Sequence, residues 1–293
     1  MGDFGLKVRM AVVGAILATF YLVAVAVAMA AFGQGVLPIA IAGSVLLVGV
    51  QYKVGKWMAL RSVGAEDLSE QRYPHIHQMV EEHSQEMGIT KPELKIARMG
   101  VPNAFAVGRK GAGIVVVSEE LIQLLDRDEL EGVLAHELAH IANRDVVTMQ
   151  LGQGIASIVG IVAQYIVLFT GDNDLADFFL AIVVGTLVQF LVMIFVLAIS
   201  RYREYVADAD AKRAIGSGDP LARALEKIHQ GNQQASESSR TARRGRSRDS
   251  RRRDANIDQQ VSALCISSPD RGFLQKIIST HPPMEKRVQR LRS

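Results

Sequence analysis

The 293-residue chain contains a single cysteine, Cys265. One cysteine can form neither an intrachain disulfide nor a zinc site built from several thiolates, which suits a reducing compartment. A lone thiol is more often an inert core residue than a nucleophile. Disulfide-stabilised folds and cysteine-based metal sites are therefore excluded for a single chain.

Charged residues are absent from three long stretches, which are 10–52, 146–170 and 178–200. The first is too long for a secretory signal peptide, whose apolar core has about 7–15 residues, and it divides at Gly33-Gln34-Gly35. A helix needs about 20 apolar residues to cross the hydrocarbon core of a bilayer. We therefore predict four transmembrane helices in two hairpins, near residues 10–32, 37–52, 146–170 and 178–200.

Lysine and arginine lie outside the two predicted hairpins and are absent from the loops within them. The flanking residues are Lys7, Arg9, Lys53, Lys56, Arg61, Arg144, Arg201 and Arg203. Positive residues favour the cytoplasmic side of a membrane. Both termini and both soluble blocks are thus expected on the cytoplasmic face of the inner cell membrane. The alternative for the second pair is two buried core helices of a globular domain.

This pattern predicts a mainly α protein with a small β-sheet. Its parts are a transmembrane hairpin (1–57), a first soluble block (58–145), a second hairpin (146–200) and a second soluble block (201–293).

Local patterns predict the elements of the soluble blocks. Apolar residues at helical spacing indicate a helix from Pro74 to Met87, and short runs between glycines indicate strands at 95–99, 104–107 and 114–117. Another helix begins at Asp126, where Glu129 completes a capping-box pattern. Its apolar face comprises Leu130, Val133, Leu134, Leu138 and Ile141. Two further helices are expected at about 202–215 and from Asp219-Pro220 onward.

Residues 231–256 differ in composition, being rich in Ser, Gln and Arg. Such a tract cannot bury apolar surface and is expected to be disordered. A solvated surface loop is favoured over a site for anionic lipid or nucleic acid. Its arginines are Arg240, Arg243, Arg244, Arg246, Arg248, Arg251, Arg252 and Arg253.

The segment His136-Glu137-Leu138-Ala139-His140 carries a candidate metal site. Positions four apart share one face of a helix, so His136 and His140 can present two imidazoles to one zinc ion. Glu137 lies about 100° around the helix and can reach a zinc-bound water without ligating the metal. Zinc lowers the pKa of that water to about 7, and Glu137 would act as the general base. The alternative is an ordinary helix with two surface histidines.

The third ligand must come from another part of the chain. The extended pattern HExxHxxGxxH fails, because its last positions are Asn143 and Val146. Glu204, on a later helix, is the candidate, and Asp208 on the same face could accept a hydrogen bond from a ligating histidine. The second hairpin would return the chain to its entry side and bring Glu204 near His140. The alternative is a surface glutamate paired with a neighbouring arginine.

Four segments resemble the HtpX-type membrane zinc metalloproteases, which are gluzincin-like and distantly similar to the CAAX prenyl endopeptidases. These segments are 102–106, 136–145, 200–208 and 279–283. The resemblance implies a zincin-like cytoplasmic protease domain with one zinc ion per chain. It also implies an endopeptidase acting on misfolded or damaged membrane proteins, with His136, His140 and Glu204 as ligands and Glu137 as base.

The resemblance further implies roles for three residues near the cleft. Asn103 would lie on an edge strand where substrate pairs, His281 would stabilise the oxyanion, and Arg287 would contact substrate. Polypeptides and the lipid bilayer are the expected partners, and nucleic acid is not. The competing functions are a zinc-stabilised membrane adaptor without catalysis and a prenyl-protein processing enzyme.

Overall fold

The structure is a computed structural model that describes residues 2–33, 35–172, 174–243 and 281–293. The chain forms two compact units, each assembled from two separate parts of the sequence. The first unit comprises Met1–Gly55 and Val147–Tyr202, and the second comprises Lys56–Val146 and Arg203–Ser293.

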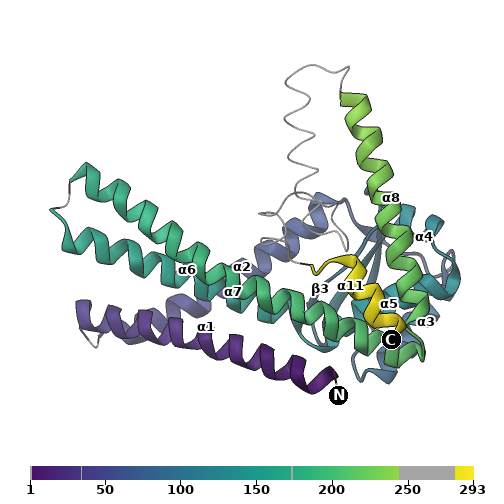
Figure 1. Cartoon of the computed structure of the whole chain (residues 1–293), viewed down its shortest axis with the longest axis horizontal. Helices are drawn as coiled ribbons and strands as arrows, with labels where there is room; N and C mark the ends of the chain where they lie inside the picture. The colour runs from purple at the N-terminus through teal and green to yellow at the C-terminus, as the bar shows by residue number, and fades with distance from the viewer. Residues whose placement is uncertain (1, 34, 173, 244–280) are drawn as a thin grey trace. The chain divides into compact units, whose positions relative to one another are not determined.

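The first unit is helical (Figure 1). It contains α1 (Gly2–Phe32) and most of α2 (Val36–Ser62), α6 (Asp145–Thr170) and α7 (Leu175–Ile215). A small core joins Leu17, Ala156, Val192, Val196 and Ile199. Helices α6 and α7 approach closely, since a Cβ built on Gly160 would lie 2.9 Å from the Cβ of Gln189.

Within the described ranges, three helical segments are long and apolar enough to cross a membrane, namely Ala11–Ala30, Asp145–Thr170 and Leu175–Ile215. Many of their large apolar side chains, such as Leu22, Leu187 and Leu191, are exposed, as expected where a helix faces lipid. The fourth predicted span, at 37–52, lies in the continuous helix α2 but is not among these three.

The second unit contains a four-stranded sheet with the order β1-β2-β4-β3. The strands are β1 (Glu66–Asp67), β2 (Glu93–Ala97), β3 (Ala104–Arg109) and β4 (Ala112–Ser118). Strand β4 pairs parallel with β2 and antiparallel with β3, which forms one edge of the sheet. The three predicted strands are confirmed, with boundaries shifted by a few residues.

Both faces of the sheet are covered by apolar side chains. Val115 and Val117 of β4 join a large core with helices α3 (Pro74–Glu86), α5 (Arg127–Ala142), α8 (Asp219–Arg243) and α11 (Met284–Arg292). Ile114 and Val116 join a second cluster that Leu60, at the end of α2, packs against. This burial on both faces explains why β4 is a continuous apolar run rather than an alternating one.

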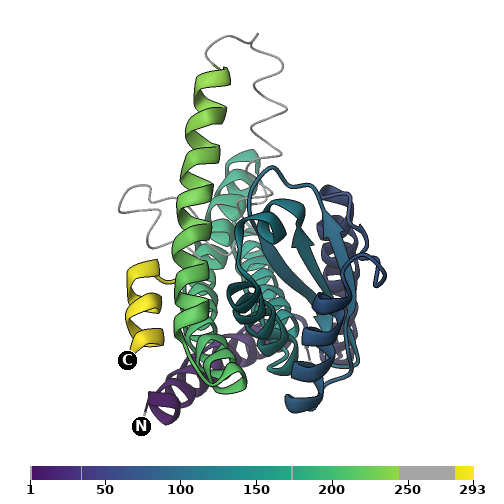
Figure 2. The same cartoon turned by 90° about the vertical axis from the view of Figure 1, so that its right-hand side faces the viewer.

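Helix α5 forms the centre of the second unit, contacting the sheet, α3 and α8 (Figure 2). The predicted capping box at its start is confirmed, because the Asp126 amide donates to Glu129 Oε2 at 2.9 Å. The predicted apolar face is fully buried. A short helix, α4 (Glu119–Leu124), connects the sheet to α5.

Two predictions about helices are wrong. Residues 178–200 and 202–215 are not separate helices but parts of the single 41-residue helix α7, because no glycine or proline interrupts residues 200–208. Residues 231–243 are helical rather than disordered. Their Gln, Ala, Glu and Arg residues favour extension of α8 beyond its packed turns. Residues 244–256 of the predicted disordered tract, and Cys265, lie outside the described residues.

Candidate active site

The motif histidines lie on one buried face of α5. Their Nε2 atoms are 3.1 Å apart, and their rings meet nearly edge to face. His136 and Glu137 are almost fully buried, while His140 is partly exposed. The surface-histidine alternative therefore does not describe this helix.

Glu204 comes from α7 and faces both imidazoles. Its Oε2 lies 3.7 Å from His136 Nε2, and its Oε1 lies 3.6 Å from His140 Nε2. One ligand atom from each of these three residues lies within 4.8 Å of the others. Residues 64 positions apart in the sequence thus form a compact group of two nitrogen donors and one oxygen donor, which is a ligand set that zinc accepts.

Asp208 and Arg287 lie beside this group and are both buried. Asp208 Oδ1 is 3.1 Å from His136 Nδ1. The Arg287 guanidinium donates to both oxygens of Asp208, at 2.9 and 2.7 Å, and lies 3.0 Å from Glu204 Oε2. Arg287 is only 2% exposed, so its side chain holds the carboxylates of Glu204 and Asp208 rather than projecting into solvent.

His281 and Asn103 occupy different positions around the group. His281 Nδ1 is 3.1 Å from Glu204 Oε2, and its side chain is 23% exposed. Asn103 is fully buried and directly precedes the edge strand β3. Its backbone amide donates to Ser118 Oγ at 2.9 Å, and its carbonyl accepts from the Ser118 amide at 2.8 Å. The geometry thus brings His281 to Glu204 and Asn103 to the start of the sheet edge.

The sequence interpretation assigned no role to Asp145 or Arg203 at this group. Asp145 Oδ2 lies 2.6 Å from His140 Nδ1, and Asp145 Oδ1 lies 3.0 Å from Arg203 Nη2. One signal existed in the sequence, because Asp145 directly precedes the apolar segment 146–170 and Arg203 lies shortly after the segment 178–200. The sequence marks Arg203 only as a flanking positive charge, and Asp145 only as the last residue of the segment 136–145 that carries the family resemblance.

The electrostatics of the site favour a bound cation. Four buried carboxylates, Glu137, Asp145, Glu204 and Asp208, face two buried guanidinium groups, Arg203 and Arg287. With all six ionised, two negative charges remain, which a divalent ion would neutralise. The residues present therefore fit a zinc ion.

The pKa values of the two histidines reflect the negative charge of the same buried carboxylates. Burial alone would lower the pKa of His136, but Asp208 and Glu204 outweigh it and raise the pKa to about 9. Burial likewise opposes protonation of His140, while Asp145 raises the pKa of that ring above its ordinary value. In the absence of metal, the site thus attracts a proton to the imidazoles.

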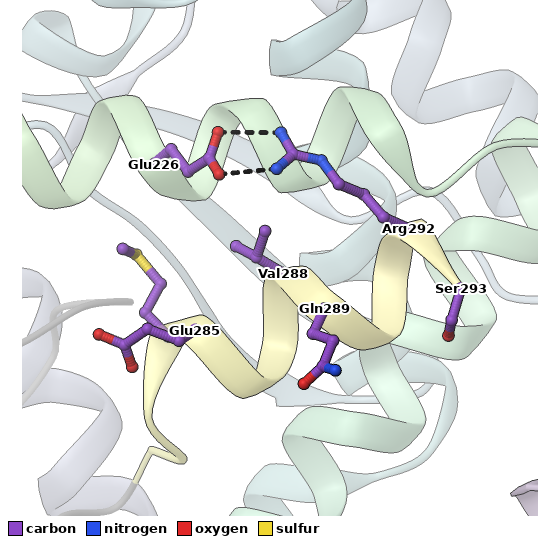
Figure 3. A pocket seen from close by; sticks show the side chains of 7 residues that line it. Glu226, Glu285, Val288, Gln289, Arg292 and Ser293 are labelled. Carbon is purple, nitrogen blue, oxygen red and sulfur yellow. Dashed lines mark hydrogen bonds and ion pairs between the residues drawn. The ribbon is translucent and has the colours of Figure 1, made fainter.

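Helix α11 carries Arg287 and is fastened to its neighbours. Figure 3 shows Arg292 paired with Glu226 of α8 through two hydrogen bonds of 2.9 and 3.0 Å. Lys212 of α7 also donates to the Leu291 carbonyl at 3.0 Å. A hollow of about 520 Å³ beside Val288 is lined by Glu226 of α8 and by residues of α11. These contacts fix the helix from which Arg287 reaches the site.

The sequence and the fold match known peptidases. The model of the family described as Peptidase family M48 matches residues 70–293. A protein named Protease HtpX homolog, from Halobacterium salinarum, is 74% identical over 289 residues and covers 97% of this chain and 100% of that protein. Another, from Aquifex aeolicus, is 34% identical and covers 85% of this chain and 82% of that protein.

The fold is similar to that in the crystal structure of S. mikatae Ste24p, with a TM-score of 0.57 and 18% identity. That match covers 99% of this chain, which spans 65% of the solved chain. At this identity, the similarity shows the fold alone.

Proposed function

The chain belongs to peptidase family M48 and is a metalloprotease, and from this premise we propose that it is a membrane-anchored zinc endopeptidase. Its proposed substrates are misfolded or damaged membrane proteins. The single observation that carries the proposal is the convergence of His136, His140 and Glu204 beside the buried Glu137.

In this proposal, His136, His140 and Glu204 hold one zinc ion per chain. When bound, the ion supplies Lewis acidity that polarises the scissile carbonyl and acidifies water. Glu137 takes the proton from the attacking water and delivers it to the leaving nitrogen. Because Glu137 is one residue from a ligand on the same helix, its carboxylate is held near the reacting groups without being a ligand itself.

Three other residues are proposed to support the reaction. His281, whose Nδ1 is 3.1 Å from Glu204, is the candidate donor to the developing oxyanion. Asn103 directly precedes β3, the edge strand along which an extended substrate would pair. Arg287 is proposed to orient Glu204 and Asp208 instead of contacting substrate, because its guanidinium already bonds both carboxylates.

The proposed anchor consists of four transmembrane helices in two hairpins, with a zincin-like domain in the cytoplasm. The three apolar helical segments support it. The lysines and arginines outside the hairpins support the orientation. The names of the relatives support a protease but not a particular substrate.

The test is metal analysis together with cleavage of an unfolded protein by the full chain in detergent. Glu137→Gln should keep about one zinc per chain and lose cleavage by at least about 1,000-fold, since both the base and its charge are lost. Glu204→Ala should lose the zinc. Glu119→Gln, which changes an exposed pair with Arg98, is the control and should behave as wild type. Cleavage that survives Glu137→Gln, or zinc content unchanged by Glu204→Ala, would contradict the proposal.

A further inference from the structure

The turn between α5 and α6 holds a buried charged pair next to one metal ligand. Asp145 is the first residue of α6, and its Oδ2 lies 2.6 Å from His140 Nδ1. Its other oxygen lies 3.0 Å from Arg203 Nη2, and Arg203 Nη1 donates to the Asp145 backbone carbonyl. Both side chains are buried.

We propose that Asp145 and Arg203 are positioning residues for His140, an inference that rests on the proposed zinc site. A carboxylate that accepts the Nδ1 proton of an imidazole fixes the ring orientation and leaves Nε2 available to the metal. In this structure, His140 Nε2 faces His136 Nε2 at 3.1 Å and Glu204 Oε1 at 3.6 Å. Asp145 therefore directs His140 toward the other two ligands.

Arg203 in turn fixes the orientation of the Asp145 carboxylate. A buried carboxylate needs a compensating charge and defined hydrogen bonds, and the planar guanidinium contacts both the side chain and the backbone of Asp145. Arg203 also directly precedes Glu204 on α7. One helix thus delivers a metal ligand and, from the adjacent residue, the partner of the group that orients another ligand.

The backbone of the turn also serves this arrangement. Helix α5 ends at Ala142, and Arg144 has a φ of 57°, a left-handed conformation uncommon for residues other than glycine. Asn143 donates to Asp210 of α7 at 2.8 Å. The turn between the two helices comprises only Asn143 and Arg144, and Asp145, five positions after His140, lies close enough to bond its ring.

A purely structural role is the competing explanation. An acidic residue in the first turn of a helix is stabilised by the helix dipole, and an Asp145–Arg203 pair could simply join α6 to α7. Such a role predicts lower stability with no change in the metal centre. The positioning role predicts a changed metal centre even where the fold survives.

The experiment replaces zinc with Co²⁺ in the full chain in detergent, because the visible spectrum of Co²⁺ reports ligand geometry. Asp145→Asn should weaken Co²⁺ and Zn²⁺ binding by about 10- to 100-fold and alter the Co²⁺ spectrum. It should also lower kcat with little change in KM. Arg203→Lys should act in the same direction with a smaller effect, since lysine cannot make the bidentate contact.

Two further measurements make the test decisive. The double variant should bind metal no more weakly than Asp145→Asn alone, because Arg203 acts through Asp145; additive losses would contradict that order. The exposed pair of Arg98 and Glu119 supplies the control, Glu119→Gln, with unchanged metal affinity and spectrum expected.

If wild type binds Co²⁺ and Zn²⁺ but a folded Asp145→Asn has the same affinity and spectrum, this inference is wrong and the proposed function stands. Should Asp145→Asn fail to fold, Arg203→Lys decides by the same two readouts. If wild type binds neither ion, the proposed function fails and takes this inference with it.

Discussion

Each of the two proposed zinc-binding histidines has its own carboxylate on the far side of the ring. Asp208 lies 3.1 Å from His136 Nδ1, and Asp145 lies 2.6 Å from His140 Nδ1. Each of these aspartates is in turn held by a buried arginine, Arg287 or Arg203. The ligand geometry therefore depends on residues that never touch the metal.

The raised pKa of His136 predicts a pH-dependent zinc affinity. In the metal-free protein, the pKa of His136 is raised from 6.5 to about 9, so a proton occupies the ring at pH 7 and zinc must displace it. Apparent zinc affinity should fall about tenfold for each pH unit below 9. Competition with a chelator between pH 6.5 and 9.5 measures it. Asp208→Asn should move the onset of this fall to lower pH, and a flat profile would contradict the assignment.

Arg287→Lys separates two roles for this residue. A substrate-contacting arginine, as the sequence suggested, would raise KM when replaced. A residue that holds Glu204 and Asp208 would instead lower kcat and zinc affinity together, by about 10- to 100-fold. We expect the second result, measured by steady-state cleavage and chelator competition. A rise in KM with normal zinc binding would restore the substrate-binding role.

At the scale of elements, the long helix α7 positions residues of the site, and the hairpin β3–β4 forms the edge of the sheet. Because α7 continues unbroken to Ile215, residues 203–208 are aligned by a rigid helix rather than by a loop. The hairpin turns at Lys110 and Gly111, and Gly108 lies within β3 opposite Gly113. Gly108 and Gly111 have φ values of 102° and 87°. Glycine adopts positive φ at little steric cost, and β3 forms one edge of the sheet.

Gly108→Ala should destabilise the hairpin much more than Gly111→Ala. Both substitutions place alanine at positive φ, at a cost of about 1–2 kcal/mol. Only at Gly108 does the new Cβ also meet backbone, 2.3 Å from the Ala112 carbonyl oxygen. The free energy of unfolding in detergent should therefore fall by several kcal/mol more for Gly108→Ala, on the order of other severe steric changes. Equal losses for the two variants would contradict this geometry.

At the scale of the whole molecule, the zinc-binding group joins three distant parts of the chain. Residues from α5, α7 and α11 meet in this group. Chelation should therefore lower the thermal unfolding midpoint. The free energy of unfolding should fall by about 4 kcal/mol when zinc had been present at 1,000 times its Kd. Differential scanning fluorimetry with a chelator, then with added zinc, measures this. Glu204→Ala serves as the control and should not respond to zinc.

The predicted orientation can be tested because the chain has one cysteine. In a Cys265→Ser background, Asp172→Cys places a thiol in the loop between α6 and α7. Since the flanking lysines and arginines favour the cytoplasm, a membrane-impermeant maleimide added to intact cells should label this thiol. It should not label Cys265 of the otherwise unchanged protein, and labelling of both or only of Cys265 would overturn the orientation.

Patterns within single elements were sufficient to predict much of this protein. The spacing of His136 and His140, the capping box at Asp126 and the apolar runs depend on neighbours a few residues away, and periodicity reveals them directly. The candidacy of Glu204 also came from the sequence, because the chain had to return from an apolar hairpin. The membership of the chain in family M48 agrees with the resemblance of its motifs to the HtpX-type metalloproteases.

Only the tertiary structure decided what surrounds the ligands. In the sequence, Arg203 is one of the flanking charges and Arg287 an expected substrate contact. Both of them, like Asp145, are buried against the proposed ligand residues or their partners. Their environment is set by segments 58 to 151 residues away, which no local period encodes. The scarcity of charge in the apolar segments therefore predicts the helices. The contacts of the few charged residues near their borders depend on the tertiary fold, because it alone brings these residues together.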